Sequence, residues 1–146
     1  MRYLLDTMVL SEPARPQPDA GVLEWLRVQA PPDLAVSVLT FGEVAHGVAR
    51  MPDGKRKTAL RNWLSTDLRE RFGERMLPVD EQVALVWGEL TAEGERIGRR
   101  LHVVDGLLLA TARVHDLTLV TRNVGDFTDR GVPIHNPWFS VRGRGR

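Results

Sequence analysis

The sequence contains no cysteine, which excludes disulfide bonds and metal sites built on thiolates. It has no apolar run near the roughly 20 residues that a membrane-spanning helix needs. An acid at position 6 interrupts the first apolar run too early for a signal peptide. The net charge is only +1, so a nucleic-acid partner would have to meet a local basic patch rather than an overall positive field. These absences favour a cytoplasmic protein with no membrane association.

The chain of 146 residues is long enough for one domain with a sizeable core. Short apolar runs, typical of buried strands, alternate with segments whose apolar residues recur at helical spacing. We predict strands at 2–5, 34–38, 75–78, 117–121 and 131–135. We predict helices at 7–12, 19–29, 40–50, 55–72, 80–97 and 104–115. This alternation indicates an α/β fold with a central parallel sheet of four to five strands flanked by helices.

Acidic residues lie near four junctions between a strand pattern and a helix pattern. These residues are Asp6, Glu43, Asp105 and Asp126. Ligands of open α/β sheets bind at the carboxyl ends of the strands, so we expect these acids to converge on one pocket. Carboxylate oxygens without a nearby lysine are suited to holding a hard divalent cation.

Each acid also has a purely structural interpretation. Asp6 and Asp105 are suitable helix N-caps. Glu43 completes a capping box with Thr40, and Asp126 suits a turn. For any one acid alone, the structural interpretation is the favoured one.

Two observations shift the balance towards a metal site. A cap accepts Ser, Thr or Asn equally well, yet all four positions hold carboxylates. The only two lysines, Lys55 and Lys57, lie in one segment away from the acids in sequence. Close carboxylates repel unless one is protonated or a cation lies between them, which favours Mg²⁺ or Mn²⁺.

Four blocks and a terminal motif follow one another along the chain. They are Leu4-Leu5-Asp6-Thr7 with Val9-Leu10-Ser11-Glu12, Ser37-Val38-Leu39-Thr40-Phe41-Gly42-Glu43-Val44 with Gly47, Asp105 before Leu108 and Ala110-Thr111-Ala112, Leu119-Val120-Thr121-Arg122-Asn123-Val124-Gly125-Asp126-Phe127, and Asn136-Pro137-Trp138. Together they closely resemble the PIN-domain ribonucleases and, more narrowly, the VapC toxins of VapBC toxin–antitoxin pairs. The resemblance covers nearly the whole chain. It implies a single three-layer PIN-like domain over 1–140, followed by a basic tail, 141–146, that we expect to be disordered.

The resemblance also implies a function. A member of this family is expected to be an endoribonuclease toxin that hydrolyses RNA phosphodiester bonds with Mg²⁺ or Mn²⁺. The acids would be both catalytic and metal-binding, and Thr7, Thr121 and Asn123 would support them. The expected partners are a VapB-like antitoxin, the RNA substrate and a second copy of the chain in a homodimer or a larger toxin–antitoxin assembly.

RNA has to be held by positive side chains near the acids. Arg15, Arg50 and Arg122 are the cations nearest to the acidic blocks in sequence, and Lys55 and Lys57 belong to a further basic segment with Arg56. We treat these as candidate RNA-binding residues. Segment 55–57 is equally consistent with a solvated helix start.

The tryptophans are candidates for base stacking, but their positions favour packing. Trp25, Trp63 and Trp87 fall on apolar helical faces, and Trp138 lies in the terminal motif, where we expect it to cap the fold.

One position departs from the family pattern. Members usually carry Asn or another small polar residue after the Asp-Thr pair, whereas this chain has Met8. A thioether donates no hydrogen bond and accepts only weakly, so we expect a lower metal affinity or rate. The alternative function is a catalytically weakened PIN-fold module that binds antitoxin or RNA.

Overall fold

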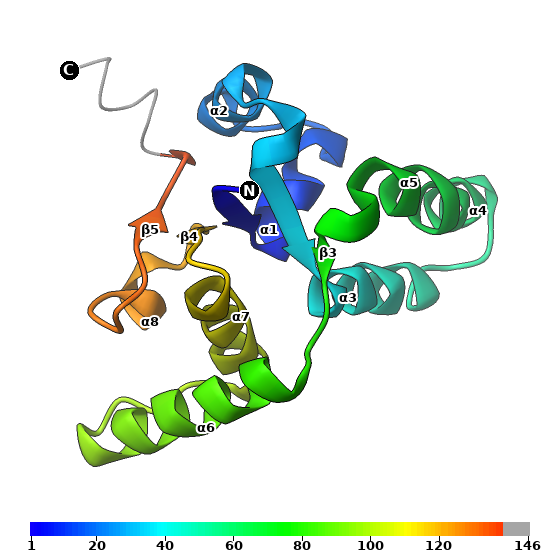
Figure 1. Cartoon of the computed structure of the whole chain (residues 1–146). Helices are drawn as coiled ribbons and strands as arrows, with labels where there is room; N and C mark the ends of the chain where they lie inside the picture. Colours follow the sequence, from blue (N-terminus) through cyan, green and yellow to red (C-terminus); the bar gives the residue numbers. More distant parts are fainter. Residues whose placement is uncertain (139–146) are drawn as a thin grey trace.

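The computed structural model describes residues 1–138, and its centre is a sheet of five strands that all run parallel. The strands lie in the order β3-β2-β1-β4-β5 (Figure 1). Their bounds are β1 Tyr3–Leu5, β2 Leu34–Ser37, β3 Met76–Leu77, β4 Thr118–Val120 and β5 Ile134–His135. The predicted α/β fold with a parallel sheet is therefore confirmed.

Helices cover both faces of this sheet. Their bounds are α1 Thr7–Ser11, α2 Ala20–Val28, α3 Val38–Ala49, α4 Lys55–Asn62, α5 Arg69–Phe72, α6 Glu81–Arg96, α7 Val103–Val114 and α8 Val124–Phe127. Short 3₁₀ helices span Glu12–Ala14, Pro31–Asp33 and Gly73–Arg75, and a π-helix spans Trp63–Leu68. Figure 1 shows α6, α7 and α8 grouped on one side, apart from α3, α4 and α5.

Two hydrophobic cores lie on the two faces of the sheet. Neighbouring residues of one strand point to opposite faces, so Leu4 belongs to the core under α6 and α7, whereas Leu5 belongs to the core under α1 and α2. Leu119 and Val120 of β4 divide in the same way. Burial on both faces requires nearly continuous apolar strands, which is the pattern that the sequence carries.

The start of α3 differs from the prediction. The N-cap is Ser37, whose Oγ accepts the backbone N–H of Leu39 at 3.0 Å, and the helix begins at Val38. The capping box of Thr40 with Glu43 is therefore wrong. Ser37 ends β2, so its hydroxyl is already in place where the first helical N–H groups need an acceptor. The Thr40 hydroxyl is buried and has no hydrogen-bond partner among the described residues.

The predicted continuous helix at 55–72 is interrupted by the π-helix. Its apolar residues Leu60, Leu64, Leu68 and Phe72 recur every four positions. In an α-helix of 3.6 residues per turn this spacing drifts around the axis, and the wider π turn offsets the drift. Leu64, Leu68 and Phe72 consequently enter one core together.

The tryptophans pack as predicted, with Trp25 and Trp138 buried and Trp63 and Trp87 packed against the two cores. Across residues 1–138, no helix has both the length and the apolar character needed to cross a membrane. The basic tail predicted at 141–146 lies outside the described residues.

Candidate active site

Asp6 lies directly after β1, where the chain turns into α1. Its backbone N–H donates to the carbonyl of Val120 at 2.9 Å, which ties it to the end of the neighbouring strand. Its Oδ1 caps α1 by accepting the N–H of Thr7 at 2.7 Å, and its Oδ2 accepts the hydroxyl of Thr121 at 2.8 Å. Asp6 is thus a helix cap, as its structural interpretation predicted, but it is also tied to a strand end far away in sequence. The two bonds fix the direction of the carboxylate.

Glu43 lies on α3, the helix that follows β2, and its side chain reaches the start of α1. Its Oε1 accepts the hydroxyl of Thr7 at 2.7 Å. Thr7 therefore connects the first two acids, since its N–H bonds to Asp6 and its hydroxyl to Glu43.

Asp105 is the third residue of α7, and the N-cap of that helix is His102, so the N-cap interpretation of Asp105 is wrong. Its carboxylate is half-buried, and burial is the main reason why its pKa lies above the ordinary value. The charges of three further acids raise the pKa too, while His102 opposes them; the three are Asp6, Asp126 and Glu43. Asp105 therefore lies within the electrostatic reach of all the other predicted acids.

Asp126 lies on α8 rather than in a turn. Its Oδ2 accepts the side-chain N–H of Asn123 at 2.6 Å. The backbone N–H of Asn123 in turn donates to Oγ1 of Thr121 at 3.0 Å. A chain of hydrogen bonds thus runs from Asp6 through Thr121 and Asn123 to Asp126.

None of these acids forms an ion pair within residues 1–138, where the ion pairs lie elsewhere. The same part of the chain contains no group of three His, Cys, Asp or Glu side chains that could surround an ion as they stand. The arrangement is therefore an open, negatively charged centre whose oxygens are hard ligands.

A family model of the PIN domain matches residues 3–130. The chain belongs to the PIN-domain family.

Two curated relatives cover almost the whole domain. Toxin FitB from Neisseria gonorrhoeae is 38% identical over 92% of this chain and 97% of its own length. VapC ribonuclease Y4jK from Sinorhizobium fredii is 35% identical over 92% of this chain and 96% of its own length. This PIN domain is thus similar to proteins of the toxin class that the sequence blocks indicate.

Solved structures agree with the fold. The crystal structure of FitAcB from Neisseria gonorrhoeae matches with a TM-score of 0.89 and 38% identity, over 93% of this chain and 98% of that chain. A member of the VapBC family of toxin–antitoxin systems from Mycobacterium tuberculosis, VapBC-5, matches with a TM-score of 0.66 and 26% identity, over 92% of this chain and 98% of that chain.

A cavity of about 300 Å³ opens beside Thr7 and Glu43 of this PIN domain. Its wall is mainly apolar and includes Val44, Met51 and Trp63, and two arginines also line it. The arginines are Arg15, which was predicted to bind RNA, and Arg56. Positive and apolar groups are therefore combined next to one of the acids.

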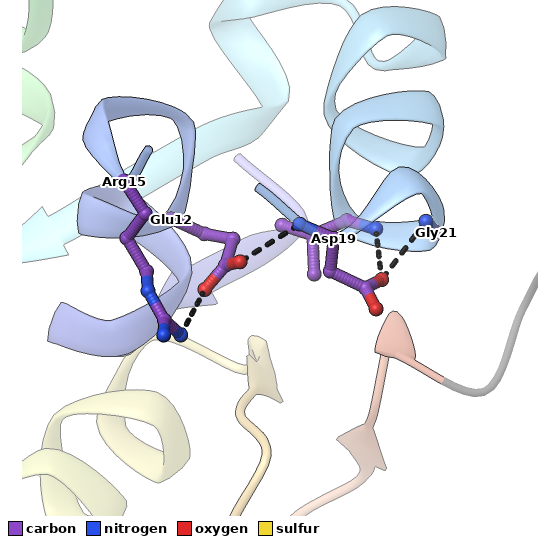
Figure 2. A network of polar contacts seen from close by, with 5 residues as sticks. Glu12, Arg15, Asp19 and Gly21 are labelled. Carbon is purple, nitrogen blue, oxygen red and sulfur yellow. Dashed lines mark hydrogen bonds and ion pairs between the residues drawn. The ribbon is translucent and has the colours of Figure 1, made fainter. Parts of the chain in front are cut away.

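A buried carboxylate that the sequence patterns did not single out holds Arg15. Glu12 is 3% exposed, pairs with Arg15 at 3.3 Å and accepts the N–H of Asp19 at 2.8 Å (Figure 2). Asp19 then caps α2 by accepting the N–H groups of Gly21 and Val22. The signal in the sequence is weak, because a Glu three residues before an Arg is common on exposed helices.

The other predicted RNA-binding residues are dispersed. Arg50 lines a separate shallow hollow, and Arg122 lies over the ring of Trp138 with 5.4 Å to its centroid. Lys55 is exposed at the start of α4. Lys57 is committed to the carbonyl of Ala49 and to Asp53, and its side chain is only 13% exposed. Of the predicted set, Arg15 lines the cavity that Glu43 also lines.

Proposed function

We propose that this PIN domain is a Mg²⁺- or Mn²⁺-dependent endoribonuclease toxin that an antitoxin holds inactive. The observation that carries the proposal is the chain of hydrogen bonds from Asp6 through Thr121 and Asn123 to Asp126, with the half-buried carboxylate of Asp105 within electrostatic reach of these acids. Four carboxylates brought together without an ion pair in residues 1–138 are unfavourable by themselves, and a divalent cation relieves their repulsion.

The donor set suits such a cation. Carboxylate oxygens are the ligands that Mg²⁺ favours, and Mg²⁺ is usually held by one or two carboxylates with water completing its shell. An open cluster of Asp6, Glu43, Asp105 and Asp126 fits this mode better than a closed cage would. When bound, such an ion supplies a more acidic water and stabilises negative charge on a phosphate.

The protein's own side chains orient the acids. The hydroxyl of Thr7 orients the carboxylate of Glu43 through a hydrogen bond of 2.7 Å, and the hydroxyl of Thr121 orients that of Asp6 through one of 2.8 Å. Asn123 does the same for Asp126. Partners of this kind hold metal-ligating side chains in their working orientation.

Binding of RNA would use the arginines of the neighbouring cavity. Arg15 and Arg56 lie on the cavity that also includes Thr7 and Glu43. Guanidinium groups form strong hydrogen bonds with phosphates, so they would position the RNA backbone across the acids. Such contacts are independent of base sequence.

The same cavity offers a place for an antitoxin segment. Its apolar wall suits an apolar anchor, and Glu43 suits a basic side chain of the partner. Toxin FitB and the VapBC-5 system support an antitoxin partner for this chain by similarity. A homodimer or a larger toxin–antitoxin assembly belongs to the same proposal.

Met8 is the basis of the alternative function, a catalytically weakened PIN-fold module that binds antitoxin or RNA without efficient cleavage. It follows Thr7 directly, and its side chain is 45% exposed. The residue therefore adds no strong hydrogen bond to the acid centre. If Met8 limits the rate, replacing Met8 by Asn should accelerate cleavage.

A cleavage assay tests the proposed function. Purified protein free of antitoxin is incubated with a labelled single-stranded RNA pool in Mn²⁺, with Asp105→Asn as the inactive variant. Asp67→Asn is the matched control, since Asp67 is exposed on the π-helix. We expect cleavage by the wild type and by Asp67→Asn and none by Asp105→Asn. RNA binding without cleavage by the wild type would favour the weakened module instead.

A further inference from the structure

Helix α8, which carries Asp126, has only four residues. A single helical turn is not stable by itself, because fixing its first residues costs more than one hydrogen bond returns. Other parts of the molecule must therefore keep this turn, and with it the Asp126 carboxylate, in place. Two arginines from outside α8 do so.

The first is Arg99, which follows the end of α6. The N–H of Arg99 donates to the carbonyl of Gly94 at 2.7 Å, and the N–H of Gly98 donates to the carbonyl of Glu95 at 3.3 Å. These two bonds, with a φ of +72° at Gly98, form a Schellman motif that reverses the chain. The side chain of Arg99 then spans two carbonyls of the α8 region, donating to Gly125 and Thr128 at 3.1 Å each.

The second is Arg130, which follows α8 in sequence and donates through Nε to the carbonyl of Asp126 at 2.8 Å. Gly94 of α6 leaves room for both arginines. A Cβ at that position would lie 2.6 Å from the carbonyl oxygen of Arg99 and 3.3 Å from Nη1 of Arg130. The absence of a side chain at Gly94 therefore makes room for the backbone of Arg99 and the side chain of Arg130.

The positive charges of the neighbouring Arg99 and Arg130 guanidinium groups repel each other, so nearby negative charge is needed to offset the repulsion. Burial lowers the pKa of Arg130. The positive charge of Arg99 lowers the same pKa further, while the negative charge of Asp126 raises it. The carbonyls at the end of α8 carry partial negative charge and supply part of the compensation. Neither arginine forms an ion pair with the Asp126 carboxylate within residues 1–138, so that carboxylate keeps one oxygen outside its bond with Asn123.

We propose that Arg99 is a positioning residue for Asp126. Its guanidinium group joins the α8 region to the segment 97–102, which leads directly into α7 and Asp105. The two acids on α7 and α8 are thereby held at a fixed separation. This inference rests on the proposed metal centre, since it concerns how two of its ligands are arranged.

The test compares Arg99→Met, Arg99→Lys and the control Arg100→Met, which removes the same charge from the exposed neighbouring residue. Hydrogen exchange of the metal-free proteins reports the stability of 124–128. Mn²⁺ binding is measured separately by electron paramagnetic resonance, well below the melting temperature of each variant, so that only folded protein is compared.

We expect faster exchange at 124–128 in Arg99→Met and a Mn²⁺ affinity about 10- to 100-fold lower, as for other partners of metal ligands. Lysine keeps the charge but reaches only one carbonyl, so Arg99→Lys should recover part of both effects. Arg100→Met should match the wild type. Unchanged exchange at 124–128 would overturn the inference, and so would faster exchange with unchanged Mn²⁺ affinity. A wild type that binds no Mn²⁺ would refute the metal centre itself, together with this inference.

Discussion

Thr121 donates its hydroxyl proton to Oδ2 of Asp6 over 2.8 Å, between residues 115 positions apart. The hydroxyl oxygen of Thr121 also accepts the backbone N–H of Asn123 at 3.0 Å, and the side-chain amide of Asn123 donates to Asp126. The Thr121 side chain is fully buried, so water does not reach it to replace these bonds. One threonine therefore connects the acid after β1 with the acid on α8.

Replacing Thr121 by Val should remove that connection while keeping the shape of the side chain. We expect cleavage or metal affinity to fall about 10- to 100-fold. The variant loses two hydrogen bonds, each worth about 0.5–1.5 kcal/mol, so the free energy of unfolding should fall by about 1–3 kcal/mol. Cleavage rates and urea denaturation measure the two effects. Thr118→Val, at the start of β4, is the control, and equal rates in the two variants would contradict the role of Thr121.

The raised pKa of Asp105 should make the free energy of unfolding of the metal-free protein depend on pH. Burial and the other acids raise its pKa, so the folded protein holds this proton more tightly than the unfolded chain. The resulting stabilisation is fully present below the ordinary pKa of 3.8 and is lost as the pH rises through the raised pKa. In EDTA at pH 7, Asp105→Asn should therefore melt at a higher temperature than the wild type.

That difference should shrink as the pH falls towards 4, because the wild-type carboxyl then becomes neutral too. Thermal melts of both proteins across this range make the comparison, with Asp67→Asn as the control for loss of an exposed charge. A metal-free Asp105→Asn variant that melts below the wild type at pH 7 would show that the carboxylate stabilises the fold.

Mn²⁺ should stabilise the folded protein if it binds the acids. At a free concentration 100 times the dissociation constant, the gain is about 2.7 kcal/mol. For a chain of this size that corresponds to a rise in melting temperature on the order of 5–10 °C. Differential scanning fluorimetry with and without EDTA measures it, and Asp126→Asn should reduce the rise. An equal rise in Asp105→Asn would place the bound ion elsewhere.

Replacing Glu12 by Ala should destabilise the loop that carries Arg15. The N–H of Asp19 loses its buried acceptor, and we expect a loss of about 1–3 kcal/mol. Glu12→Gln keeps an acceptor and should lose less. Arg15→Met should cost under about 1 kcal/mol, since the Arg15 side chain is 59% exposed and such ion pairs are weak. If Glu12→Ala unfolds at the same urea concentration as the wild type, the network in Figure 2 does not stabilise the loop.

The sequence predicted the parallel sheet, and the expectation that the acids lie near one another rests on the same simple pattern. Apolar runs define parallel strands, and the carboxyl ends of parallel strands share one edge of the sheet. The start of α3 was not predictable in the same way, since Ser37 and Thr40 are both good caps and only the end of β2 decides between them.

Contacts between distant segments were also beyond the sequence patterns. The chain folds back after Glu12 and brings the N–H of Asp19 against its buried carboxylate. Arg99 reaches α8 only because the turn at Gly98 reverses the chain after α6. Lys57 was a candidate for RNA contact, yet the end of α3 places a carbonyl and Asp53 within its reach.

Locating bound Mn²⁺ by its anomalous scattering, in crystals of the protein free of antitoxin, tests the central claim most directly. We predict a peak among Asp6, Glu43, Asp105 and Asp126, within coordination distance of at least one carboxylate oxygen. The peak should disappear in crystals of Asp105→Asn. Crystals soaked to saturation that show no peak among these side chains, or a peak only elsewhere on the surface, would contradict the metal centre.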